Sequence, residues 1–136
     1  MTELLVDTSL AVPLVLISHE AHASVNASVG GRSVALAGHA AHETYAVLTR
    51  LPGDARLIPR DAVRLLSERF DPAVVLDARS ARAALAVLAD LEIAGGATYD
   101  GLIGLAARSS GLPLASRDRR AEGTYRRLGV EVELLT

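Results

Sequence analysis

Short apolar runs alternate with stretches of helical periodicity along the whole chain. The apolar runs are typical of buried strands and cover residues 4–6, 33–37, 73–76, 112–116 and 130–135. The stretches with helical spacing of apolar residues cover 10–17, 19–29, 39–51, 60–70, 78–93, 98–110 and 118–128. Strands that alternate with helices predict an α/β fold, a three-layer α/β/α sandwich around a central, mostly parallel sheet.

Capping and turn residues refine this outline. Pro13 is expected close to the first turn of the first helix, where proline is best tolerated. Asp77 is expected to cap the helix after the third strand, and Thr98 the helix that ends at Gly111. The last strand, 130–135, alternates apolar residues with glutamates, which predicts a sheet edge with one wetter face.

Length and composition narrow the class of protein. A chain of 136 residues is expected to form a single domain, 1–136. Half of the residues are hydrophobic but only 3% are aromatic, so Leu, Val, Ala and Ile must fill the core. The absence of cysteine excludes disulfides, thiolate catalysis and cysteine-ligated metals. With no secretory signal and no apolar run of the roughly 18 residues that a membrane span needs, we expect a cytoplasmic protein without membrane contact.

Charge is nearly balanced overall but concentrated locally. The net charge of −2 argues against a general nucleic-acid coat protein. All basic residues are arginines, and five of them cluster near Asp118: Arg117, Arg119, Arg120, Arg126 and Arg127. The cluster has two open interpretations: it is a solvated helix face, or it binds phosphate groups.

Acidic residues follow three of the predicted strands. They are Asp7, Asp77 and Asp118. In a parallel sheet the carboxyl ends of the strands form the functional crevice, although an aspartate there can also be a simple helix cap. Asp77 is interpreted as a cap, because its helix starts at once.

Two further acids lie near the starts of predicted helices. Glu43 is one turn into its helix, and Asp100 enters a strongly apolar one. If both converge with Asp7 and Asp118, the carboxylates repel one another unless a divalent cation is bound. Oxygen-only ligands favour Mg²⁺ or Mn²⁺ over structural zinc.

Four sequence segments together resemble the VapC branch of the PIN-domain family. They are VDTS at 6–9, HETYAVLTRL with Glu43, YDGLIGLAA with Asp100, and LPLASRDRR with Asp118. The resemblance assigns the four family acids to these positions, in chain order from Asp7. Ser9 matches a hydroxyl position near the first acid, and Ser116 stands where relatives often have threonine.

The resemblance implies a metal-dependent endoribonuclease toxin of a type II toxin–antitoxin pair. Its substrates would be tRNA or rRNA, its partner a VapB-type antitoxin, and its usual state a homodimer. Asp7, Asp100 and Asp118 are the expected ligands of Mg²⁺ or Mn²⁺, with Glu43 as a ligand or as an acceptor for a metal-bound water. Ser9, Ser116, Arg117, Arg119 and Arg120 are the expected substrate-binding residues.

Three alternative functions can be compared with the ribonuclease interpretation. A non-catalytic module that binds RNA or antitoxin would use the acids only for structure. A zinc hydrolase could use His39, His42 and Glu43, but their order matches no known zinc-protease motif. A phosphatase with Asp7 as nucleophile would need a lysine partner, and the chain has no lysine.

Overall fold

A computed structural model describes residues 1–135 and contains one five-stranded sheet. Its strands are β1 (Leu4–Val6), β2 (Val34–Ala37), β3 (Asp71–Val74), β4 (Leu114–Ser116) and β5 (Val132–Leu134). They lie in the order β3-β2-β1-β4-β5, and every neighbouring pair is parallel. The predicted edge position of the last strand is confirmed.

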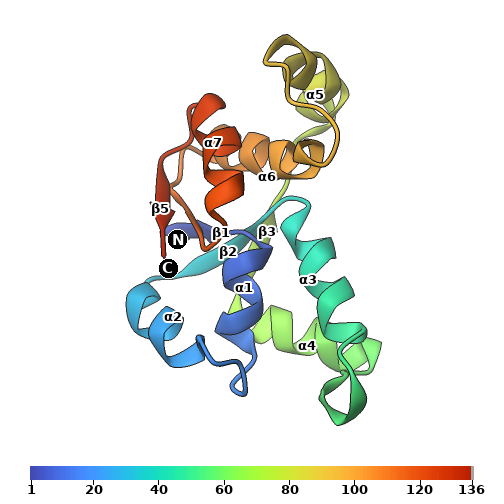
Figure 1. Ribbon diagram of the computed structural model, residues 1–136, viewed down its shortest axis with the longest axis vertical. Helices are drawn as coiled ribbons and strands as arrows, with labels where there is room; N and C mark the ends of the chain where they lie inside the picture. Colours follow the sequence, from blue (N-terminus) through green and yellow to red (C-terminus); the bar gives the residue numbers. More distant parts are fainter. Residues whose placement is uncertain (136) are drawn as a thin grey trace.

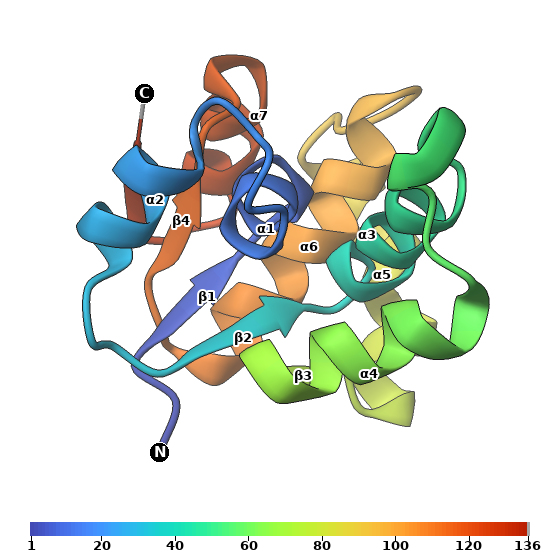
Figure 2. The same ribbon diagram turned by 90° about the horizontal axis from the view of Figure 1, so that it is seen from below.

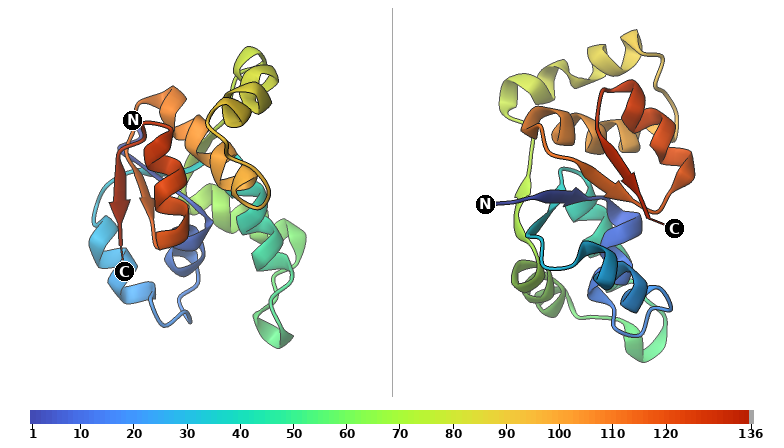
Figure 3. Two further views of the ribbon diagram at one scale, coloured as in Figure 1. Left: turned by 45° about the horizontal axis from the view of Figure 1, so that its top comes forward. Right: turned by 90° about the vertical axis from the view of Figure 1, so that its left-hand side faces the viewer.

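Helices cover both faces of this sheet. They are α1 (Thr8–Val15), α2 (His22–Val29), α3 (Ala40–Thr49), α4 (Pro59–Arg69), α5 (Ala78–Asp90), α6 (Ala97–Ser110) and α7 (Arg119–Arg127), with a short 3₁₀ helix at Gly53–Ala55. Helices α1 to α4 lie on one side of the sheet, whereas α6 and α7 lie on the other with α5 outside α6 (Figures 1 and 3). The predicted three-layer sandwich is confirmed.

The central strand β1 anchors the core. Leu4, Leu5 and Val6 are fully buried because helices cover both faces of the strand. Figure 2 shows β1 passing between the helical layers toward α1. On the far side, Gly104 lets α6 approach α7 closely, because a Cβ there would lie 2.7 Å from Leu128 Cδ1.

The structure corrects several local predictions. β3 spans Asp71–Val74 rather than 73–76, since Pro72 is tolerated in a strand at the sheet edge. Pro13 lies inside α1 rather than near its first turn, because the helix begins already at Thr8. Thr98 is not a cap: α6 begins at Ala97, with Gly96 at the N-cap position.

Candidate active site

The carboxyl ends of the parallel strands bring the predicted acids to one edge of the sheet. Asp7 follows β1 and caps α1, while Asp118 follows β4 and caps α7. Glu43 lies in the first turn of α3 and Asp100 in the first turn of α6. The charges of Asp118, Asp7 and Glu43 all act on the Asp100 carboxyl, so the four acids form one electrostatic group.

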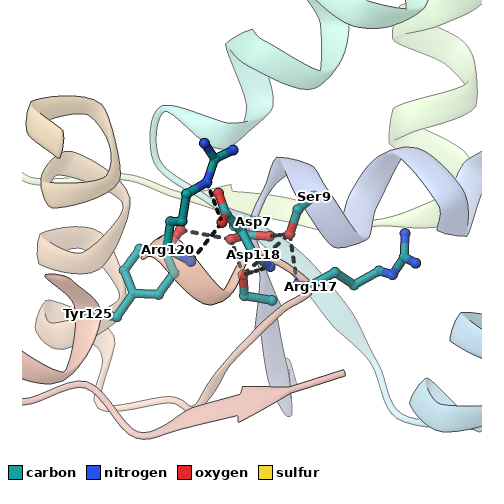
Figure 4. A network of polar contacts seen from close by, with 7 residues as sticks. Asp7, Ser9, Arg117, Asp118, Arg120 and Tyr125 are labelled. Atoms are coloured by element: carbon teal, nitrogen blue, oxygen red, sulfur yellow. Dashed lines mark hydrogen bonds and ion pairs between the residues drawn. The ribbon is translucent and has the colours of Figure 1, made fainter. Parts of the chain in front are cut away.

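Asp7 is buried and held by four donors (Figure 4). Its Oδ1 accepts from the Ser9 hydroxyl at 2.6 Å and the Leu10 N–H at 3.3 Å. Its Oδ2 accepts from the Ser116 hydroxyl at 2.6 Å and the Tyr125 hydroxyl at 2.8 Å. Because these donors come from α1, β4 and α7, the orientation of this carboxylate is fixed by three elements of the fold.

Ser9 and Ser116 therefore lie at the site, as expected, but their protein contacts are structural. The Ser9 hydroxyl also accepts from the Arg117 N–H at 2.8 Å, and the Ser116 hydroxyl accepts from the Asp118 N–H at 3.0 Å. The two hydroxyl oxygens are 3.3 Å apart. The pair thus ties the loop after β4 to the end of β1.

Sequence reasoning missed Tyr125. Its side chain is fully buried, and burial together with the Asp7 charge raises the pKa of its hydroxyl, which stays a proton donor. The sequence signal that could have identified it is the spacing of Ala121, Tyr125 and Leu128, which gives the polar helix α7 one apolar face. A tyrosine on such a face needs a buried partner for its hydroxyl.

Of the arginine cluster, Arg120 lies closest to the acids. Its N–H donates to Asp118 Oδ1 at 2.9 Å, and its Nε lies 3.8 Å from the same oxygen. Its charge also lowers the pKa of Asp100. The side chain of Arg117 points away from the acids (Figure 4), and Arg119 is exposed.

Asp100 and Glu43 show that the acidic charge at this site is only partly balanced by Arg120. Burial first, and then the charges of the other acids, raise the pKa of Asp100 to about 6. Glu43 Oε2 is 3.5 Å from the Thr8 hydroxyl, whereas the buried Oε1 has no hydrogen-bond partner. His39 Nε2 is 4.0 Å from this Oε1, too far for a hydrogen bond.

These residues fit a hard divalent cation in their chemistry. They supply only oxygen donors, the charges of three of them raise the pKa of Asp100, and one buried oxygen, Glu43 Oε1, lacks a partner. Within residues 1–135, no three His, Asp or Glu side chains lie close enough together to hold a metal ion. That includes His39, His42 and Glu43, so the structure offers no zinc site there.

Asp77 lies outside this group, as predicted. It caps α5 through a 2.7 Å bond from the Ser80 N–H, which lowers the pKa of this exposed carboxyl. It serves below as a matched control.

Residues 4–127, nearly the whole chain, match the PIN domain family. The chain belongs to the PIN domain family. It is 53% identical over 129 residues to ribonuclease VapC27 of Mycobacterium tuberculosis, a match that covers 95% of this chain and 94% of the relative. It is also 44% identical to ribonuclease VapC40 of the same species, over 96% of this chain and 97% of the relative. The resemblance to VapC-type toxins is confirmed.

Solved structures share the fold at low identity. FitAB bound to a DNA fragment has a TM-score of 0.64 at 20% identity and covers 96% of this chain and 94% of that one. M. tuberculosis VapC20, described as a toxin that cleaves the sarcin–ricin loop, has a TM-score of 0.61 at 20% identity and covers 89% and 94%. At this identity the likeness supports the fold alone. No helix within residues 1–135 is long and apolar enough to cross a lipid bilayer.

Proposed function

We propose that this PIN domain is an endoribonuclease toxin that hydrolyses phosphodiester bonds in RNA with the help of Mg²⁺ or Mn²⁺. The observation that carries the proposal is the group of four carboxylates at one edge of the sheet, where burial first and then the charges of the other three acids raise the pKa of Asp100. The near full-length similarity to ribonucleases VapC27 and VapC40 supports the same chemistry.

Within this proposal, Asp7, Asp100 and Asp118 would hold the cation, with Glu43 as a further ligand or as an acceptor for water. These carboxylates would have to move closer together to do so, because no three of the acids within residues 1–135 lie at ligand spacing in the structure. A bound divalent cation lowers the pKa of the water that attacks the phosphorus. It also offsets the negative charge that develops on the phosphate oxygens. Ser116 and Tyr125 fix Asp7 from the protein side, so its orientation does not depend on the ligand.

The arginines supply the positive charge that the acids lack. Arg120 lies beside Asp118, where its guanidinium would bind a phosphate that flanks the scissile bond. Arg117 and Arg119 extend this charge outward, toward more distant phosphates. No side-chain nucleophile is needed.

The same relatives support partners for the protein. The VapC names of the relatives support a cognate VapB-type antitoxin. We expect a homodimer that acts in the cytoplasm, on tRNA or rRNA.

The deciding experiment is RNA cleavage by the purified chain, with total tRNA and rRNA as substrates, in Mg²⁺, Mn²⁺ or EDTA. We expect cleavage that needs the cation and is lost in Asp100→Asn. Asp77→Asn is the matched control, because it makes the same chemical change at an exposed helix cap.

Two outcomes would contradict the proposal. Cleavage that persists in EDTA would remove the cation from the mechanism. Equal cleavage by Asp100→Asn and the parent protein would favour a non-catalytic module whose acids serve structure, and any observed hydrolysis would then come from a contaminant.

A further inference from the structure

A row of three rings lies beside the acidic centre. Tyr99 stacks on His39 with ring centres 5.3 Å apart and planes inclined by 23°. The His39 ring lies 5.8 Å from that of His42. Tyr99 comes from the start of α6, whereas the histidines come from the start of α3, so the fold brings the rings together.

The row borders the acidic centre at Glu43. His39 Nε2 lies 4.0 Å from Glu43 Oε1, and Tyr99, which stacks on His39, is in the same first turn of α6 as Asp100. A group bound against these rings would therefore lie next to a phosphodiester bond placed at the acids.

Tyr99 differs from the other large rings of the chain, which has three tyrosines, one phenylalanine and no tryptophan. Tyr125 and Phe70 are buried, and Tyr45 packs against the core. Tyr99 is 55% exposed, although His39 orients it by stacking. The fold thus presents one large, pre-oriented π face to solvent beside the site.

We infer that the Tyr99–His39 pair is a stacking platform for a nucleobase next to the scissile phosphate of single-stranded RNA. The inference rests on the proposed function and extends it by stating where one base of the RNA substrate binds. Unpaired bases of RNA are commonly bound by stacking on tyrosine and histidine rings. Stacking accepts any base with a π face, so the platform selects unpaired nucleotides rather than a sequence.

The test measures binding without cleavage. In an Asp100→Asn background with Mg²⁺, the affinity for a fluorescein-labelled single-stranded RNA decamer is measured by anisotropy. Adding Tyr99→Ala should weaken binding roughly 5- to 150-fold, which is the range for the loss of one stacked base. Tyr99→Phe keeps the ring and should restore the affinity. Leu85→Ala removes an apolar side chain on α5 that is even more exposed, 72% against 55% for Tyr99, and should have no effect.

A decamer of abasic nucleotides separates stacking from a structural effect. It has the same phosphates but no bases, so it should bind equally to the background protein and to the protein with Tyr99→Ala. Equal binding of the normal decamer to these two proteins would overturn the inference. So would an equal loss in Tyr99→Phe, which would assign the effect to the hydroxyl. Because no turnover is measured, the result can be interpreted even if the parent protein proves not to cleave RNA.

Discussion

Replacing Asp100 with asparagine should stabilise the metal-free protein while it abolishes activity. In the folded protein, burial first and then the charges of three other acids raise the pKa of Asp100 from 3.8 to about 6. Below pH 3.8 the group is protonated in both folded and unfolded chains and costs nothing. Between pH 3.8 and about 6 the unfolded chain loses this proton while the folded state keeps it, so the free energy of unfolding falls across this window, and above pH 6 the group causes no further change.

The size of the effect follows from the shift. At 1.36 kcal/mol per pKa unit, ionisation of Asp100 costs the folded state at most about 3 kcal/mol. Because Asp100 is only half-buried, screening by solvent reduces this cost to about 1–2 kcal/mol. For a domain of this size, Asp100→Asn should therefore raise the melting temperature by about 3–8 °C at neutral pH.

The assay is thermal unfolding followed by circular dichroism in EDTA, at pH 4 and at pH 7.5. The gain in Asp100→Asn should be large at pH 7.5 and small at pH 4, and Asp77→Asn should show little change because asparagine is an equally good cap. Added Mg²⁺ should stabilise the parent protein and not the variant. An unchanged or lower melting temperature of Asp100→Asn at pH 7.5 would refute the reasoning that an ionised Asp100, partly buried beside three other acids, destabilises the folded protein.

Three further predictions concern α7 and its contacts. Tyr125→Phe removes a donor from the buried Asp7 and should lower the free energy of unfolding by about 1–3 kcal/mol in urea titrations; no change would show that the hydroxyl contributes nothing. Arg120→Ala should weaken RNA binding and reduce the slope of log affinity against log salt by about 1, whereas Arg126→Ala, whose side chain is paired with a glutamate, should change the slope less. Gly104→Ala should cost about 1–3 kcal/mol of stability by overpacking α6 against α7, and wild-type stability would contradict the close approach.

The sequence was sufficient for the architecture because its signals are local. The apolar run at 4–6 and the residue that ends it, Asp7, predict a strand, a cap and a site in one place. The third strand was misplaced because Asp71 and Pro72 are poor strand residues, and only their position at the sheet edge makes them acceptable. Thr98 has good capping chemistry, but the N-cap position of α6 lies two residues earlier, at Gly96.

Contacts between distant residues were harder to predict. The hydrogen bond between Tyr125 and Asp7 joins residues 118 positions apart in the sequence. No local sequence pattern predicts which residue accepts the hydrogen bond of a buried tyrosine. Asp7 and Asp118 could be predicted because they follow parallel strands whose ends meet at one edge, whereas Glu43 and Asp100, which lie in helices, were assigned by the resemblance to the family. Their individual surroundings, such as the partnerless oxygen of Glu43, depend on side-chain packing that spacing does not encode.

The anchoring of Asp7 by α1, β4 and α7 has a consequence for genetics. In a selection for cells that survive production of this protein, substitutions at Asp100 should yield inactive molecules that still accumulate, because they relieve repulsion. Substitutions at Asp7 leave several buried donors without an acceptor, and such molecules should be removed by proteolysis. Immunoblots of the survivors would thus separate the two carboxylates by the amount of protein that remains.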